Sequence, residues 1–258
     1  MQDTDLSPSA YPRALLRFSK AKWHSHTITS EKLRFTPVEE WRRLEGADDA
    51  RGDAWEGATK IGQPVDIKSV KLQFSSDPSG QWIEHKLVGP IVHLGGLTDF
   101  PATHDVCFNM LTNQSVTEAI SKGQNNIDLN RFRKEFGPSL LVVDDVPKFL
   151  QLVICAIGKS NIAIETSSHG LVKYVDQKSF SGAYTIYHKP MHFGWQQEFR
   201  IAVSVQNGEN KPIFLHVPGL NEVCNIIEDL ESKIDLIRNN DGSTSVSISQ
   251  RVSSGTNG

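Results

Sequence analysis

The sequence predicts an α+β protein with a mixed, mainly antiparallel sheet and short flanking helices. Expected strands outnumber expected helices along the 258 residues and do not alternate regularly with them. This is the pattern of α+β proteins and not of doubly wound ones. Residues 65–74 and 82–94 also alternate apolar and polar side chains over long stretches, as a half-exposed antiparallel hairpin does.

Each expected element has a local signal. Pro37 and Gly46 bracket one helix, and Ser115, Glu118 and Gly123 supply the N-cap, capping box and stop of another. Helices are expected at 20–32 (helix or turn), 37–46, 115–123, 128–137, 146–160 and 220–240, the last being helical or a short strand followed by a helix. Strands are expected at 13–18, 33–37, 65–74, 82–94, 104–111, 139–145, 171–176, 183–189, 198–205 and 212–217.

Length and composition indicate one globular domain. We expect a flexible lead-in over 1–12, a single α+β domain over 13–238, and a disordered Ser/Gly/Asn-rich tail over 239–258. The net charge of −3 does not indicate a strongly basic nucleic-acid surface. No apolar run approaches the roughly 20 residues that span a bilayer, so we expect no membrane contact and a cytoplasmic location.

The three cysteines are expected to be reduced and buried. Cys107, Cys155 and Cys224 are far apart and have apolar neighbours, which is typical of thiols that pack as small hydrophobes. The sequence indicates no metal site, since the histidine pairs His24/His26 and His188/His192 lack an accompanying ligand cluster. Sequence motifs for a nucleophile elbow, a phosphate loop and a dinucleotide fold are also absent.

The segment from His188 to Val203 carries the most suggestive chemistry. Read as a strand, it places Gln196, Glu198 and Arg200 on one face, next to Trp195, with apolar residues on the other face. An amide, a carboxylate and a guanidinium in line suit a ligand with hydroxyls and phosphates. A polar outer face with a Glu–Arg pair of little energetic weight explains the same pattern equally well.

The loop "ARGDAWEG", residues 50–57, is a second candidate. Arg51, Asp53 and Glu56 share it with one tryptophan and two glycines. Functional residues concentrate in loops held by rigid elements. A solvated charged loop with one anchoring tryptophan is an equally good interpretation.

Several short motifs follow one another along the chain. They are Arg17-Phe18, Asp53 with Glu56-Gly57, Cys107-Phe108, Val172-Lys173-Tyr174, and Lys189 followed by Trp195-Gln196-Gln197-Glu198-Phe199-Arg200. Their order resembles a family of uncharacterised prokaryotic proteins associated with phage-defence genes, and the resemblance covers roughly residues 14–203. This chain departs from the family pattern in the 50–57 loop, where the family tends to have Asn-Asp-Pro, and in lacking a Trp-x-x-Tyr element after the Cys-Phe strand.

Gln196-x-Glu198 is also similar to the (Gln/Glu)-x-Glu signature of ADP-ribosyltransferases, including toxins of the DarT type that modify DNA. Arg17 stands on the first strand, where that superfamily places its NAD-holding Arg or His. The resemblance implies NAD as substrate, a nucleic-acid or protein acceptor, and catalytic roles for Glu198, Gln196 and Arg17. The NAD-binding residues that follow from this interpretation are Arg17, Arg51, Asp53, Glu56, Trp195 and Arg200.

Three functions therefore compete. The first is an NAD-dependent ADP-ribosyltransferase-like toxin or anti-phage effector, for which Arg17, Glu198 and the 51–56 loop should line one cleft. A structure with Arg17 and Glu198 on opposite sides of the sheet would count against this function and favour the second one. The second is a non-catalytic module that binds or senses a nucleotide, a nucleic acid or a protein. The third is a nuclease, which needs Asp53, Glu56 and Glu198 to converge.

Overall fold

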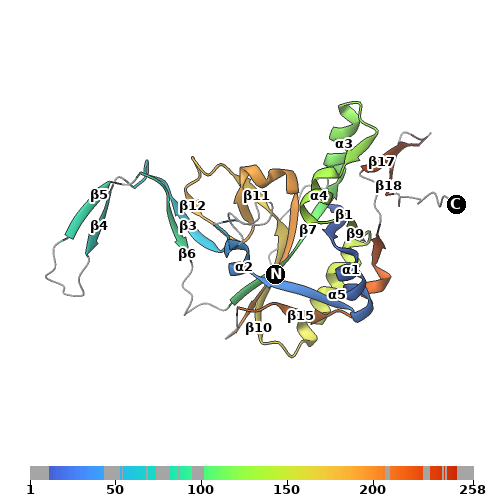
Figure 1. Cartoon of the computed structure of the whole chain (residues 1–258), viewed down its shortest axis with the longest axis horizontal. Helices are drawn as coiled ribbons and strands as arrows, with labels where there is room; N and C mark the ends of the chain where they lie inside the picture. Colours follow the sequence, from blue (N-terminus) through green and yellow to red (C-terminus); the bar gives the residue numbers. More distant parts are fainter. Residues whose placement is uncertain are drawn as a thin grey trace, which may run out of the picture.

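The computed structural model describes residues 12–43, 53, 55–67, 69–73, 82–86, 88–94, 102–206, 210–228, 233–239, 241 and 243–248. Mainly antiparallel strands with few helices confirm the α+β class (Figure 1). No helix within the described ranges is both long and apolar enough to cross a membrane.

The centre of the molecule is an eight-stranded sheet whose neighbouring strands are all antiparallel. Six strands follow one another across it, and two more branch from it. The six, in spatial order, are β10 (Ile164–Leu171), β14 (Glu198–Val205), β7 (Ala102–Thr112), β1 (Pro12–Ser19), β9 (Ser139–Val143) and β16 (Cys224–Ile227). The branching strands are β2 (Lys32–Pro37) and β15 (Ile213–His216).

β1 and β2 both pair with the same edge of β7, at different ends of it, and the gap between them is called the fork. At one end, Asn109 and the residues after it pair with β1. At the other end, His104 and Asp105 pair with β2. Between them, residues 106–108 pair with β14 on one side but with neither β1 nor β2 on the other. The main sheet is therefore open between β1 and β2.

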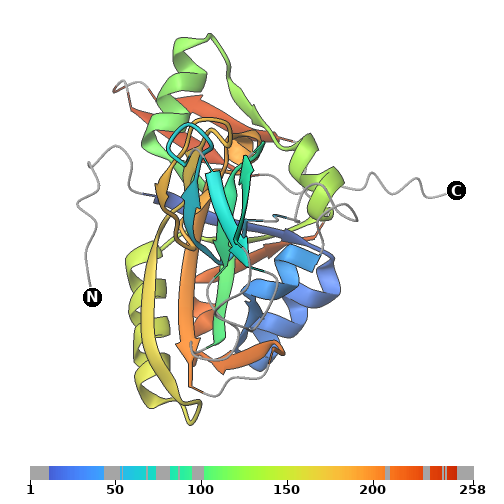
Figure 2. The same ribbon diagram turned by 90° about the vertical axis from the view of Figure 1, so that its left-hand side faces the viewer.

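Alternation along the strands gives the sheet two different faces. Leu15, Phe108 and Phe199 belong to the larger core, on the face that packs against α5 (Val146–Lys159). Figure 2 shows α5 running alongside the sheet. The Asp145 side chain accepts from the Lys148 amide and begins this helix. The opposite face carries a second apolar core under α3 and α4 at one end and the charged residues of β7 and β14 at the other.

The remaining elements lie around this sheet. The helices other than α5 are α1 (Ala21–Ser30), α2 (Val38–Arg43), α3 (Asn113–Ser121), α4 (Asn130–Phe136) and the 3₁₀ turns η1 (Met191–Gln196) and η2 (Leu220–Glu222). Two three-stranded sheets are β12 (Gly182–Ala183), β3 (Ala58–Gly62) and β6 (Ile91–Leu94), and β18 (Thr244–Ser247), β17 (Lys233–Arg238) and β8 (Asn126–Asp128). β11 (Lys173–Val175) pairs in parallel with β13 (His188–Pro190).

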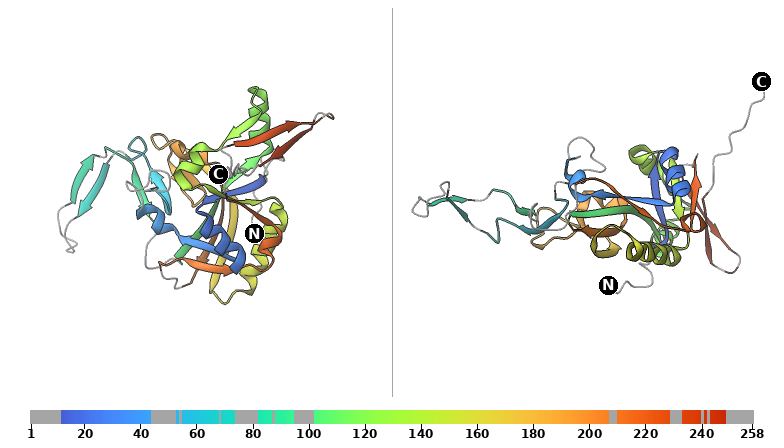
Figure 3. Two further views of the ribbon diagram at one scale, coloured as in Figure 1. Left: turned by 45° about the vertical axis from the view of Figure 1, so that its right-hand side comes forward. Right: turned by 90° about the horizontal axis from the view of Figure 1, so that it is seen from below.

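The alternating stretch after residue 65 forms the expected hairpin. β4 (Ser69–Gln73) pairs antiparallel with β5 (Trp82–Lys86). The hairpin projects away from the main sheet as an arm (Figures 1 and 3). The last part of the stretch does not continue this hairpin, because β6 pairs with β3 instead.

Several local predictions were wrong for identifiable reasons. The expected α-helix within 220–240 is absent from the described residues there. Cys224–Ile227 form the short strand of the second alternative, beside β9, but Lys233–Arg238 pair with β8 and β18 where that alternative expected a helix. The N-cap of α3 is Thr112, with Ser115 at N3, because β7 runs directly into the helix. Thr244–Ser247 form β18 within the stretch expected to be disordered. Tertiary pairing overrode local propensity in each case.

The cysteines are unpaired, as expected, but not uniformly buried. Cys224 is buried and Cys107 is half-buried, whereas Cys155 is exposed. Cys155 lies on the outer side of α5, whose buried stripe includes Phe149, Val153 and Ala156. Helical periodicity and not the apolar neighbours in sequence decides the exposure of Cys155.

Candidate functional site

The fork between β1 and β2 contains a cavity of about 670 Å³. Its walls come from β1, α1, β2 and α2 on one side and from β7, β13, η1 and β14 on the other. Glu56, Phe136 of α4 and Phe214 of β15 complete it. A cavity of this size matches typical small-molecule sites.

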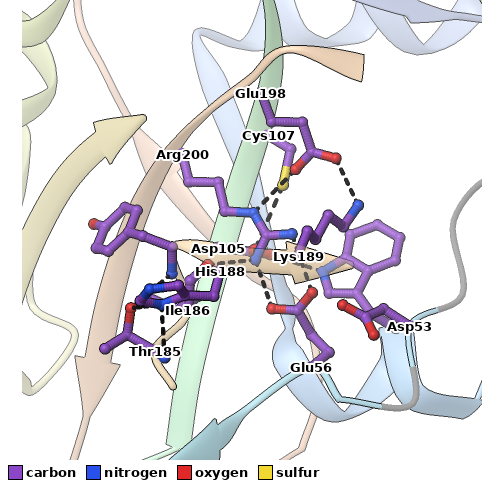
Figure 4. Close-up of polar contacts among 12 residues, drawn as sticks. Asp53, Glu56, Asp105, Cys107, Thr185, Ile186, His188, Lys189, Glu198 and Arg200 are labelled. Carbon is purple, nitrogen blue, oxygen red and sulfur yellow. Dashed lines mark hydrogen bonds and ion pairs between the residues drawn. The ribbon is translucent and has the colours of Figure 1, made fainter. Parts of the chain in front are cut away.

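Arg200 is the centre of a buried ion network at the base of this cavity (Figure 4). Its guanidinium donates to both carboxylate oxygens of Glu56, at 2.5 and 3.0 Å, and its Nε donates to Glu198 Oε2 at 3.0 Å. Asp105 Oδ2 lies 3.6 Å from Nη1, and the Ile186 carbonyl accepts from Nη1 at 2.6 Å. The side chain of Arg200 is 1% exposed, so these acceptors replace water completely.

Lys189 completes the network from the other side of Glu198. Its ammonium donates to Glu198 Oε1 at 2.6 Å and to Gln196 Oε1 at 2.9 Å. The side chains of Lys189 and Glu198 are 5% and 6% exposed. Both oxygens of Glu198 are therefore held by cations, one by Lys189 and the other by Arg200.

Local backbone geometry presents these side chains. β13 ends at Pro190, η1 turns the chain, and Gln197 closes that turn with a φ of 44° before β14 begins. The Glu198 amide donates to the Tyr174 hydroxyl at 2.9 Å, which fixes the first residue of β14. This turn brings the side chains of Lys189 and Gln196 next to Glu198. Gln196 lies in the 3₁₀ turn and not in the expected strand.

Glu56 reaches Arg200 from a tight turn. The Asp53 carboxylate accepts from the Trp55 amide, and the Glu56 amide donates to the Asp53 carbonyl. Gly57 follows with a φ of +74°, and a Cβ there would lie 2.8 Å from Val38 Cγ1. Glycine is required at this turn both by the backbone angle and by the close approach of α2.

The protonation of the network follows from burial and from neighbouring charges. Burial raises the pKa of a carboxylate, but Lys189 and Arg200 outweigh this at Glu198 and lower its pKa to about 2. Burial dominates at Glu56, where it raises the pKa to about 7 in spite of Arg200. Burial alone would lower the pKa of Arg200, and the surrounding acids raise it instead. Glu198 is thus anionic and Arg200 cationic at neutral pH.

The low pKa of Glu198 in the folded protein predicts how the free energy of unfolding depends on pH. The pKa of Glu198 falls from 4.5 to about 2 on folding, so its stabilising effect is fully present above about pH 4.5 and is lost towards pH 2. We expect the wild type to be more stable than Glu198→Gln at neutral pH, and the difference to shrink steadily below pH 4.5. Urea unfolding of both proteins across this range measures it, and a difference independent of pH would contradict the assignment.

Arg17 lines the same cavity from β1. Strand alternation puts its side chain on the α5 face, where its guanidinium lies 5.9 Å from the ring centre of Phe108. Because the sheet is open at the fork, this side chain and Glu198, from opposite faces, border one space. Burial lowers the pKa of Arg17. Within the described ranges, its guanidinium has no hydrogen bond or ion pair to a side chain.

The structure brings together five of the residues singled out from sequence. Arg17, Glu56, Gln196, Glu198 and Arg200 all line the cavity. The polar face of β14 is buried, so the interpretation of this face as a polar outer surface is wrong.

Three other predicted residues take different places. Asp53 is buried in the turn before Glu56 and does not line the cavity. Trp195 packs against Phe132 and Phe136 of α4, with the Arg131 guanidinium 3.8 Å from its ring centre, and borders a separate cavity. The 3₁₀ turn points Trp195 away from Glu198. Arg51 lies outside the described residues.

Sequence reasoning gave no role in the site to Lys189, and it did not single out Asp105 and Trp41, which support the buried network. Trp41 Nε1 donates to Asp105 Oδ1 at 2.8 Å, which ties α2 to the network. Asp105 could have been found, because a lone acid in an apolar strand must have a partner when it is buried. Lys189 gave a weaker signal, since its partner Glu198 is nine positions away across a turn.

No family model, curated protein or solved structure matches this chain. The assignment of function therefore depends on the geometry of the cavity.

Proposed function

We propose that this chain is an NAD-using ADP-ribosyltransferase-like protein, acting as a toxin or anti-phage effector, with its NAD site in the cavity at the fork. The observation that carries the proposal is the meeting of Arg17, Gln196 and Glu198 around one cavity of about 670 Å³. Their separation in sequence makes this meeting a product of the fold, and the volume suits a dinucleotide-sized ligand.

The charges of the cavity suit NAD. The guanidinium of Arg17 has no carboxylate partner in the described part of the chain, and its paired N–H donors fit a diphosphate. Glu198 lies deeper, buried and anionic because Lys189 and Arg200 lower its pKa to about 2. An anionic carboxylate in a low-dielectric site stabilises positive charge more strongly than it would in water.

The chemistry follows from this arrangement. Breaking the bond between ribose C1′ and the nicotinamide nitrogen passes through an oxocarbenium-like state. Nicotinamide leaves with the bonding electron pair, the acceptor nucleophile bonds to C1′, and the acceptor releases its proton. Glu198 would stabilise the charge on the ribose, and Gln196 would orient the acceptor. Lys189 donates hydrogen bonds to both side chains and would fix their positions relative to each other.

The test is incubation of the purified chain with NAD labelled in its adenylate half, together with separate nucleic-acid and protein acceptors. We expect label to move to one acceptor class and nicotinamide to be released in equal amount. Release of nicotinamide without transfer would indicate an NAD hydrolase. Absence of any nicotinamide release in the presence of all acceptors would refute the proposal.

A non-catalytic binding module is the second candidate. Two observations favour it. The side chains of Arg17 and Glu198 come from opposite faces of the sheet, and both carboxylate oxygens of Glu198 are already held by Lys189 and Arg200. In this case the network is a rigid floor and the cavity binds its ligand without reaction. Tight binding of NAD with no nicotinamide release distinguishes it.

A nuclease is less well supported. That function needs Asp53, Glu56 and Glu198 to converge as free carboxylates. Instead, Arg200 bridges Glu56 and Glu198, and Asp53 is turned into its own loop.

A further inference from the structure

Two exposed aromatic side chains border the cavity at the fork. Among the large hydrophobic residues that are exposed in the described part of the chain, only Trp23 and Phe214 are aromatic, at 56% and 49% exposure. Both line this cavity. Single exposed apolar side chains are common on protein surfaces, but two large aromatic rings at one cavity are typical of a binding site.

The fold places these two rings on separate walls. Trp23 shares one face of α1 with His26 and Thr27, at helical spacing, and these three line the cavity. Phe214 lies on β15 directly opposite Arg34 of β2. Leu33, on the other face of β2, is fully buried in the larger core, so the cavity-facing side of this strand pair is rigidly held.

The cations around these rings are only partly neutralised. Arg34 pairs with Glu40, and Lys189 and Arg200 belong to the buried network. Arg17 and Lys32 also line the cavity, and within the described ranges neither has a carboxylate partner. Lys22 adds a further positive charge 4.9 Å from the ring centre of Trp23. The chain as a whole carries a net charge of −3, so this concentration of positive charge is local.

Flat apolar rings beside unpaired cations match one ligand chemistry. Nucleobases stack on aromatic side chains because each presents a π-face, and phosphates take guanidinium and ammonium donors. A nucleoside diphosphate carries both groups a short distance apart. A simple anion would leave Trp23 and Phe214 without a role, and an apolar ligand would leave Arg17 and Lys32 without one.

We propose that Trp23 and Phe214 form a base-stacking platform for the adenine of an adenosine diphosphate moiety, whose phosphates bind Arg17 and Lys32. The inference rests on the proposed function in one respect: in NAD, this placement leaves the nicotinamide ribose to extend inward to Glu198. The platform thus sets the direction in which the dinucleotide enters the cavity, with the adenosine end towards α1 and β15.

Binding of ADP by calorimetry tests the platform without requiring turnover. Loss of stacking on one aromatic weakens base binding roughly 5- to 150-fold. We expect that loss in Trp23→Leu and in Phe214→Leu, and retention of most affinity in Trp23→Phe, which keeps a ring. Ile154→Ala alters an exposed hydrophobic on α5 outside the cavity and serves as the control. Thermal melts of all four variants verify folding, which the exposure of these side chains should preserve.

Inorganic pyrophosphate separates stacking from charge. Its affinity should be unchanged in Trp23→Leu and should fall in Arg17→Met. Three results would overturn the platform: no ADP binding by the wild type, unchanged ADP affinity in both leucine variants, or parallel loss of ADP and pyrophosphate in Trp23→Leu. A single-stranded oligonucleotide that binds through Trp23 while ADP does not would likewise overturn it, in favour of a nucleic-acid surface.

Measurements of ADP affinity and nicotinamide release on these variants and on Glu198→Gln test the platform and the transferase proposal independently. If ADP binding depends on Trp23 but NAD releases no nicotinamide, the platform stands and the transferase proposal fails. If nicotinamide release depends on Glu198 but ADP affinity is indifferent to Trp23 and Phe214, the transferase proposal stands and the platform fails.

Discussion

Arg200→Met is expected to lower the free energy of unfolding by about 3–5 kcal/mol. Among the residues that the structure describes, Arg200 is the only one whose side chain bonds both Glu56 and Glu198, and the variant also leaves Asp105 without its nearby guanidinium. Methionine fills part of the same volume but supplies no positive charge. Carboxylates buried without a cation cost far more than the original network did, so unfolding by urea should begin at a clearly lower concentration.

Arg238→Met is the matched control for this measurement. Arg238 ends β17 and is exposed, so the same change of side chain there removes a charge from water-accessible surface. Such changes are usually within about 0.5 kcal/mol. Equal losses of stability in the two variants would show that the network around Arg200 is not a structural element of the fold.

Glu198→Gln is expected to lower nicotinamide release by a factor of about 10²–10³, the effect of losing one electrostatic contact to a transition state. The amide keeps the shape of the side chain but not its charge. The variant is also expected to lose stability, because Lys189 and Arg200 each lose an anionic partner in a buried site. Initial rates with labelled NAD, taken well below the melting temperature of the variant, separate the two effects.

Asp105→Asn provides the comparison that assigns the activity loss to chemistry. Asp105 is a fully buried carboxylate near the same guanidinium, and its bond to Trp41 gives it a structural role. We expect this variant to melt earlier, as Glu198→Gln does, but to keep nicotinamide release within a few-fold of the wild type. If both variants lose activity in proportion to their stability, Glu198 is a structural residue and the binding-module alternative gains support.

Local sequence determined the elements from which the site is built. Alternation in residues 198–205 put Glu198 and Arg200 on one face of a strand and Phe199, Ile201 and Val203 on the other, as the core confirms. Local periodicity also indicated α5, through apolar residues at helical spacing, and the β4–β5 hairpin. These features were predictable because the period of a helix or strand acts over neighbouring residues.

Only the tertiary structure decided which charges are buried and which residues surround the cavity. Glu56 and Arg200 are 144 positions apart, and the strand face that carries Arg200 becomes buried because the turn at 53–57 and β13 pack over it. The same long-range packing turned Trp195 away from Glu198, made residues 224–227 a sheet strand, and brought Trp23 and Phe214 to one cavity. Burial of a charge depends on what covers it, and a local pattern carries no information about a distant segment that supplies the cover.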